Sequence, residues 1–147
     1  MNILFICTGN TCRSPMAEAI LKHKSTNFNV KSAGTFAGQG ADANPNTVQV
    51  LQENNIQITH RSQQVTEDLL GWAHVVLTMT RSHKEQLLHQ FPSKEDKIYT
   101  IMEYVNEGKK SESRIDIIDP FGGSIDTYRQ TYVELEQLIK KLIKTNK

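Results

Sequence analysis

Short apolar runs alternate with amphipathic stretches along the chain. Four runs have the length and composition of strands: residues 3–7, 28–33, 75–79 and 97–101. The first run is apolar throughout, which is typical of a strand buried on both faces of a parallel sheet. The intervening stretches have apolar residues at helical spacing and predict helices at 14–24, from 44 through 51, from 66, at 81–91 and from 124 onward.

Strands that alternate with helices predict an α/β fold with a parallel sheet. Ser14-Pro15 and Asn44-Pro45 each combine a capping residue with a proline, which is typical of a helix start. The last helix has one apolar face, made of Tyr132, Leu135, Leu138, Ile139, Leu142 and Ile143. In open parallel sheets, ligands bind beyond the carboxyl ends of the strands. The loop that follows residue 7 is therefore expected at the ligand-binding edge.

Composition narrows the class of protein. A length of 147 residues suits one domain, residues 1–147, and a formal net charge of +1 does not favour binding to nucleic acid or to an anionic membrane. The chain has two cysteines, too few for a disulfide scaffold, and no signal-peptide pattern. No stretch approaches the roughly 18 apolar residues of a membrane span. We expect a cytoplasmic protein, with a surface loop at 106–116.

The loop between the first strand and the first helix has an unusual composition. A thiol, Cys7, ends the strand, and Arg13 follows six positions later, just before the helix. Gly9 and Asn10 lie between Cys7 and Arg13, and both tolerate positive φ angles. The loop can therefore turn its backbone N–H groups inward as an anion nest. The helix N-terminus adds further donors. The guanidinium of Arg13 can bind two phosphate oxygens, so the loop predicts a phosphate cradle.

A thiol at the floor of such a cradle suits nucleophilic attack on phosphorus. Positive charge from Arg13 and from the helix N-terminus favours the thiolate of Cys7, which is the nucleophilic form. Ser14 can donate its hydroxyl to the same sulfur. The alternative is a strand cysteine that only packs, followed by an arginine that faces solvent. The strand, turn and helix start occur together here, and that combination favours the phosphate site.

These residues closely resemble the P-loop of the low-molecular-weight protein tyrosine phosphatase family, which has C-x5-R-S after its first strand. Ser32-Ala33-Gly34-Thr35, His60-Arg61-Ser62 and Asp119-Pro120-Phe121 resemble further motifs of that family. The resemblance implies a four-stranded parallel sheet, order 2-1-3-4, flanked by helices on both faces. It implies catalysis by Cys7, Arg13 and Asp119 through a phosphocysteine. It also implies phosphate binding by a set of loop residues: Thr8, Gly9, Asn10, Thr11, Cys12, Arg13 and Ser14.

Two positions bear on the substrate. The acid loop runs Asp119-Pro120-Phe121-Gly122-Gly123-Ser124, whereas tyrosine-specific members usually have a second aromatic after the first. Thr11 stands where those members commonly have a larger aliphatic residue. Both features resemble the bacterial protein-arginine phosphatases of the same family. The resemblance therefore implies phosphoarginine in proteins as substrate, with Thr11 and Phe121 setting specificity, and phosphotyrosine as the alternative.

Other interpretations remain open at this point. Asp-Pro is a common turn starter, so Asp119 has a structural interpretation as well. A non-catalytic phosphate-binding module is a second alternative. A thioredoxin-coupled arsenate reductase shares the loop but needs further cysteines downstream, and none follows Cys12. Cys12 is predicted either to form a disulfide with an oxidised Cys7 or to pack beneath the loop.

No cofactor is implied. The five histidines form no H-E-x-x-H pattern and have no close spacing with the cysteines, so no metal site is expected. The nucleotide-binding G-x-G-x-x-G pattern is also missing from the sequence. The expected partners are phosphorylated proteins, and the expected state is a monomer.

Overall fold

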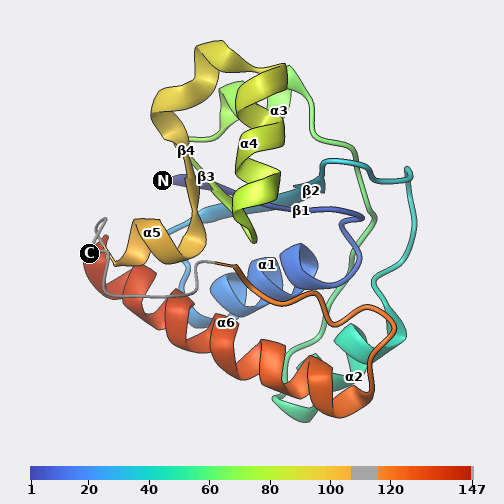
Figure 1. Cartoon of the computed structure of the whole chain (residues 1–147). Helices are drawn as coiled ribbons and strands as arrows, with labels where there is room; N and C mark the ends of the chain where they lie inside the picture. The colour runs from blue at the N-terminus through green and yellow to red at the C-terminus, as the bar shows by residue number, and fades with distance from the viewer. Residues whose placement is uncertain (107–115, 147) are drawn as a thin grey trace.

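The computed structural model describes residues 1–106 and 116–146 (Figure 1). Its core is a parallel sheet with the strand order β2-β1-β3-β4. The strands are β1 (Asn2–Cys7), β2 (Asn29–Gly34), β3 (Val75–Thr78) and β4 (Ile98–Thr100). The predicted α/β class, the parallel sheet and the strand order are confirmed.

Helices cover both faces of this sheet. They are α1 (Arg13–Lys24), α2 (Pro45–Glu53), α3 (Glu67–Trp72), α4 (Arg81–Gln90), the 3-10 helix η1 (Pro92–Lys97), α5 (Ile101–Val105) and α6 (Ile125–Thr145). In Figure 1, α3 and α4 lie on one side of the sheet, and α1, α2, α5 and α6 lie on the other. None of the helices in the described residues is both long enough and apolar enough to cross a bilayer.

Strand β1 is buried on both faces, as its unbroken apolar sequence predicts. Ile3 and Phe5 belong to the core cluster formed with α1, α2, α5 and α6. Leu4 and Ile6 point to the opposite face and join the cluster that includes Leu70 and Leu87. Each face of a strand takes alternate residues, so one run of apolar positions supplies both cores. The predicted face of α6 is also confirmed, since its residues pack in the first cluster.

The predicted helix starts are correct at α2 and α3 but not at α1. The side chain of Asn44 accepts a hydrogen bond at the start of α2, and that of Thr66 does so at the start of α3. At α1 the N-cap is Cys12, and Ser14 lies inside the first turn. The hydroxyl of Ser14 contacts the sulfur of Cys7 instead of capping the helix. The earlier start brings the helix N-terminus directly against the loop.

The run 97–101 is shorter as a strand than predicted. Strand β4 ends at Thr100, and Ile101 begins α5, a helix that the apolar pattern did not indicate. Thr100 and Glu103 form a capping box, in which each side chain binds the other's backbone N–H. The capping box accounts for the abrupt change from strand to helix. Of the predicted surface loop at 106–116, residues 107–115 lie outside the described part of the chain.

Candidate active site

A cavity of about 230 Å³ opens at the carboxyl end of β1. Its lining residues are Cys7, Thr8, Gly9, Thr11, Cys12, Arg13, Asp119 and Phe121. The three residues expected to carry catalysis and the two expected to set specificity therefore share one cavity, although more than a hundred positions separate the loop from Phe121. Asn10 and Ser14, also expected to bind phosphate, are fully buried behind the loop and do not line the cavity.

The sulfur of Cys7 lies at the bottom of the loop and is surrounded by donors. Cys7 is 3% exposed. Its sulfur is 2.9 Å from the hydroxyl oxygen of Ser14, and it accepts a hydrogen bond from the backbone N–H of Asn10 at 3.3 Å. Hydrogen bonds to a thiolate favour that form over the thiol. The surroundings of Cys7 therefore suit an anionic nucleophile.

The turn of the loop depends on Asn10. Its φ angle is +56°, in the left-handed region that asparagine tolerates better than most residues. Gly9 also tolerates positive φ but does not adopt it here. Asn10 is completely buried, and its side chain is fixed on both sides of the amide. The conformation that aims its backbone N–H at the sulfur is therefore held by side-chain bonds.

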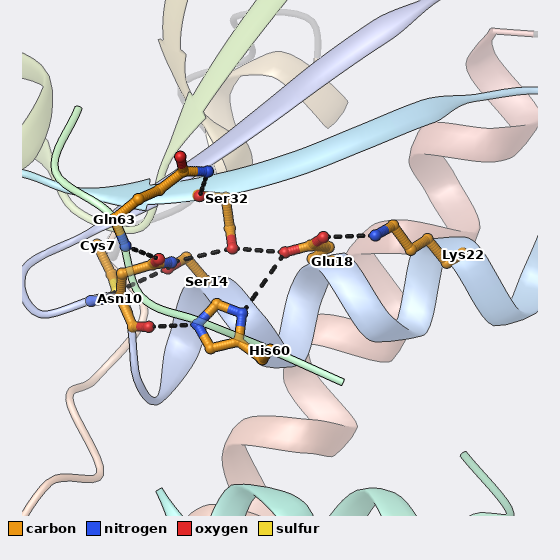
Figure 2. Close-up of polar contacts among 8 residues, drawn as sticks. All are labelled: Cys7, Asn10, Ser14, Glu18, Lys22, Ser32, His60 and Gln63. Atoms are coloured by element: carbon orange, nitrogen blue, oxygen red, sulfur yellow. Dashed lines mark hydrogen bonds and ion pairs between the residues drawn. The ribbon is translucent and has the colours of Figure 1, made fainter. Parts of the chain in front are cut away.

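Figure 2 shows how the amide of Asn10 is held. Its Nδ2 atom donates to the hydroxyl oxygens of Ser14 (2.8 Å) and Ser32 (2.9 Å), and its Oδ1 atom accepts from the backbone N–H of Gln63 (3.0 Å). Because Ser14 accepts from Asn10, its own hydrogen is free to point at Cys7. The network therefore makes Ser14 a donor towards the sulfur.

The network ends at charged groups on α1. Ser32 donates to the carboxylate of Glu18 at 2.5 Å, and the other oxygen of that carboxylate is 2.6 Å from the ammonium of Lys22 (Figure 2). The ring of His60 lies beside them. Its Nε2 atom is 2.6 Å from the backbone oxygen of Asn10, and its Nδ1 atom is 4.0 Å from Glu18. A backbone oxygen only accepts, so Nε2 carries the hydrogen and His60 supports the loop from behind.

Arg13 is buried and bridges the loop to a distant segment. It is 4% exposed. One nitrogen of its guanidinium donates to the backbone oxygen of Ile117 at 2.8 Å. Another nitrogen is 3.6 Å from a carboxylate oxygen of Asp119. The guanidinium thus holds the Asp119 segment against the cavity and keeps positive charge in its wall.

The segment that contains Asp119 is anchored to the end of β3. The backbone N–H of Ile117 donates to the backbone oxygen of Met79 at 2.8 Å, and the Ile117 side chain is buried in the core. Further on, an oxygen of Asp119 accepts from the backbone N–H of Phe121 at 3.0 Å, an Asx turn. Asp119 therefore has the structural role that Asp-Pro suggests and also faces the cavity.

A tight turn follows Asp119. The backbone N–H of Gly123 donates to the oxygen of Pro120 at 2.8 Å, and Gly122 has a φ angle of +80°. A turn of this kind favours glycine at its third position, because side chains make positive φ costly. Phe121 projects from the turn and is 72% exposed. The backbone therefore explains why one aromatic residue, and no second, follows Pro120.

Cys12 also lines the cavity, and its thiol is buried beside a tyrosine hydroxyl. Burial raises the pKa of the Cys12 thiol, and its neighbour is the hydroxyl of Tyr128, 3.6 Å away. The pKa of Tyr128 is raised as well, chiefly by burial. Both groups therefore stay protonated at neutral pH. Both cysteines are free in this structure.

Three side chains that lie beside the loop were not predicted from the sequence as site residues. His60 was noted only as part of a family motif, and Glu18 and His83 were not considered for the site. His83 lies beside the loop, with its Nε2 atom 2.8 Å from the hydroxyl oxygen of Thr8. The contacts of these histidines span 50 and 75 positions of sequence, so no local spacing could reveal them. For Glu18, the only sign in the sequence that it supports the site is its position one helical turn after Ser14.

No group of three or more histidine, cysteine, aspartate or glutamate residues is arranged to hold a metal ion within residues 1–106 and 116–146.

A parallel α/β sheet with a cysteine-arginine loop at the end of its first strand, and a carboxylate in the same cavity, is typical of cysteine-dependent phosphatases. The comparison with family models agrees. The model of the low molecular weight phosphotyrosine protein phosphatase family matches residues 2–147. The chain belongs to this family.

Relatives with two different names resemble the chain closely. The protein-arginine-phosphatase of Bacillus subtilis is 47% identical over 98% of this chain and 95% of its own length. The low molecular weight protein-tyrosine-phosphatase PtpB of Staphylococcus haemolyticus is 44% identical over 97% of each chain. Among solved structures, the YwlE arginine phosphatase from Geobacillus stearothermophilus has a TM-score of 0.91 at 45% identity, covering 98% of this chain and 91% of that one.

A second solved structure bears on the chemistry. It is a C7S mutant of YwlE arginine phosphatase with a phosphorylated active-site serine. It has a TM-score of 0.92 at 46% identity and covers 99% of this chain and 95% of that one.

Proposed function

We propose that the chain is a protein phosphatase that hydrolyses phosphoarginine in proteins through a phosphocysteine on Cys7. The observation that carries the proposal is the wall of the cavity, where Thr11 and Phe121 lie with Cys7 and Asp119. The names of the similar arginine phosphatases and the phosphorylated serine in the YwlE mutant support it. Residues 1–147 are proposed to act as one domain.

The mechanism has two steps. In the first, the sulfur of Cys7 attacks phosphorus, the bond from phosphorus to nitrogen breaks, and Asp119 protonates the departing guanidine nitrogen. In the second, Asp119 takes a proton from water while the water oxygen attacks phosphorus, and Cys7 leaves as thiolate. Arg13 and the backbone N–H groups of the loop neutralise the phosphoryl oxygens throughout.

Thr11 and Phe121 favour a guanidinium over an aromatic ring. Thr11 is β-branched and stiff, so its methyl group and hydroxyl stand at fixed places on the cavity wall. A guanidinium can donate an N–H to that hydroxyl oxygen, whereas an aryl ring has no donor to offer, and Thr11→Ile removes the hydroxyl. Phe121 offers one exposed face on which a guanidinium can stack. Gly122 adds no second aromatic wall.

Phosphotyrosine is the second candidate substrate. The exposed ring of Phe121 also suits stacking with a tyrosine ring. A similar protein, PtpB, is named a tyrosine phosphatase. The two substrates differ in what must be protonated as the bond breaks, a guanidine nitrogen or a phenol oxygen, and both reactions use the same three catalytic groups.

The deciding experiment compares kcat/KM for phosphoarginine and phosphotyrosine peptides of the same sequence, with wild type and Thr11→Ile. Wild type is expected to prefer phosphoarginine, and Thr11→Ile to shift the preference towards phosphotyrosine. Thr26→Ile is the matched control, since Thr26 is exposed in the turn between α1 and β2, away from the loop. Better or equal use of phosphotyrosine by wild type would overturn the arginine specificity alone.

A non-catalytic phosphate-binding module is tested separately. Cys7→Ser is expected to abolish turnover of both peptides while phosphate or substrate still binds. Substantial turnover by this variant would remove Cys7 from the nucleophile's role. Absence of turnover by wild type on both peptides would favour the binding module.

We further propose that the protein works in the cytoplasm as a monomer, without cofactor or metal, on phosphorylated proteins and not on nucleic acid. The net charge of +1 supports the last point, since it creates no broad field for a polyanion. The two free thiols suit a reducing compartment. Gel filtration with light scattering tests the oligomeric state.

A further inference from the structure

His83 is buried against the phosphate loop although the mechanism does not use it. It lies in the first turn of α4, is 3% exposed, and its Nε2 atom is 2.8 Å from the hydroxyl oxygen of Thr8. Its other ring nitrogen, Nδ1, is buried and has no hydrogen-bond partner among residues 1–106 and 116–146. Thr8 follows β1 and His83 follows β3, so this contact joins the ends of two adjacent strands.

The surroundings of His83 fix which nitrogen carries the hydrogen. Burial, with a further contribution from Arg13, lowers the pKa of His83 to about 4, so the ring is neutral at physiological pH. Asp116 and Asp119 also act on the ring and partly oppose this shift. In a neutral ring, a hydrogen on Nδ1 would be a buried donor without an acceptor, which folded proteins rarely contain. The hydrogen therefore belongs on Nε2, and Nε2 donates to Thr8.

The hydroxyl oxygen of Thr8 is consequently held as the acceptor of a hydrogen bond from His83. One lone pair and the hydroxyl hydrogen of Thr8 remain available. Its backbone is fixed as well, because its carbonyl oxygen accepts from the backbone N–H of Phe36 at 3.0 Å. Thr8 is exposed and lines the cavity. The unused lone pair is thus a pre-organised acceptor on a wall of the site.

We propose that Thr8, positioned by His83, accepts a hydrogen bond from the guanidinium of phosphoarginine, beside the charged acceptor Asp119. This inference rests on the proposed function. The phosphoguanidinium group has N–H donors next to the phosphorus, whereas phosphotyrosine has none at that place. A site with a fixed acceptor discriminates against a ligand without a donor, because the acceptor then loses its water and gains no partner.

The experiment measures the ratio of kcat/KM for phosphoarginine and phosphotyrosine peptides of the same sequence. Thr8→Val keeps the shape of threonine and removes its hydroxyl, and Thr8→Ser keeps the hydroxyl. Thr8→Val is expected to lower the ratio by about 10-fold, the effect of one hydrogen bond to a charged group. Thr8→Ser is expected to keep most of the ratio.

A second pair of variants tests His83 as a positioning residue. His83→Gln keeps a donor N–H near the position of Nε2, and His83→Met fills similar space without any donor. His83→Met is expected to lower the ratio in the same direction as Thr8→Val, mainly through a higher KM for the phosphoarginine peptide. His83→Gln is expected to restore it. If His83 had a purely structural role, each variant would lose activity equally on both peptides. The loss of activity would then follow the loss of thermal stability in that variant.

The outcomes separate this inference from the proposed function. An equal loss on both peptides with Thr8→Val would overturn the recognition role of Thr8, whatever wild type prefers. A wild type that prefers phosphotyrosine would overturn the arginine specificity. A selective loss on phosphoarginine in such an enzyme would still establish Thr8 as the acceptor for the guanidinium. If His83→Met fails to fold, the Thr8 pair decides alone.

Discussion

The hydroxyl of Ser14 lies 2.9 Å from the sulfur of Cys7, and Asn10 holds it there by donating to the same oxygen. The hydrogen of Ser14 is therefore directed at the sulfur. In the proposed mechanism, we expect this contact to matter most when the sulfur leaves as a thiolate, in hydrolysis of the phosphocysteine. The arrangement is then expected to stabilise the leaving group in the second step more than it helps the first.

Ser14→Ala is expected to slow hydrolysis of the phosphocysteine by about 10-fold or more, because a charge-assisted hydrogen bond is lost. Formation of the phosphocysteine is expected to slow less. Rapid-quench kinetics should then show a burst of leaving group and a phosphorylated enzyme that accumulates. Equal slowing of both steps would contradict a role in the departure of sulfur.

Asp119→Asn removes the carboxylate but keeps an oxygen that can accept from Phe121, so the Asx turn is expected to remain. Turnover of a substrate with a poor leaving group should fall by about 10²–10⁴-fold. The loss should shrink for 4-nitrophenyl phosphate, whose leaving group needs little protonation. Asp126→Asn, in the first turn of α6, is a control that should leave both rates unchanged. A small and uniform loss in Asp119→Asn would leave Asp119 with its turn role alone.

The close approach of Gly34 to the phosphate loop predicts a strong effect on stability. A Cβ atom added at Gly34 would lie 2.2 Å from the backbone oxygen of Thr8, whereas one added at Gly38 would meet nothing within 4 Å. Gly34→Ala must therefore push the loop away from β2, at a cost of about 2–3 kcal/mol. Gly38→Ala should be nearly neutral. Urea denaturation of both variants tests this, and similar midpoints would contradict it.

The sequence predicts the sheet and most of its helices because their signals are local. An apolar run such as 3–7 and a cap such as Asn44 are complete within a few residues. The motif around Thr100 and Glu103 was equally local, and the capping box there could have predicted α5. The predicted start of α1 was wrong because the hydroxyl of Ser14 contacts the sulfur of Cys7 instead of capping the helix. Helix propensities do not describe such a contact.

The site is predictable only in part, for a physical reason. Cys7 and Arg13 share one loop, so their chemistry follows from spacing. The contacts that hold the loop come from elsewhere: His60 and Gln63 reach Asn10 across at least 50 positions. Such contacts depend on how two crossover segments pack over the sheet, and apolar periodicity carries no information on them. Asp119 entered the prediction through a family motif, since its local sequence indicates only a turn.

Oxidation is expected to inactivate the enzyme reversibly. Peroxide should convert the thiolate of Cys7 to a sulfenic acid with loss of hydroxide, and Cys12 should then displace water to form a disulfide. Because burial raises the pKa of Cys12, the second reaction should speed up as pH rises above neutral. The measurement is recovery of activity by dithiol after peroxide, with mass spectrometry of the linked peptide.

Cys12→Ala is the control for this switch. The variant should lose activity to peroxide irreversibly, because no thiol protects the sulfenic acid from further oxidation. If wild type also loses activity irreversibly and no Cys7–Cys12 peptide forms, Cys12 only packs against Tyr128.

Burial of neutral His83 predicts how stability depends on pH. Its pKa is about 4 in the folded protein and about 6.5 in an unfolded chain, so between these values the unfolded state binds more protons. The free energy of unfolding should therefore fall as pH is lowered through this window, by up to about 1.4 kcal/mol per pH unit from this group. The loss should be complete below pH 4 and absent above pH 6.5.

His83→Met removes this titration without placing a new polar group in the core. Wild type and variant are compared by urea denaturation at several pH values from 7 to 4, so that the other titrating groups cancel in the difference. The variant should gain stability relative to wild type as pH falls. In wild type the folded state keeps the buried ring of His83 unprotonated, which costs more free energy as pH falls, and the variant has no such ring. A difference in stability that stays constant across the window would mean that His83 is protonated as easily in the folded protein as in the unfolded chain.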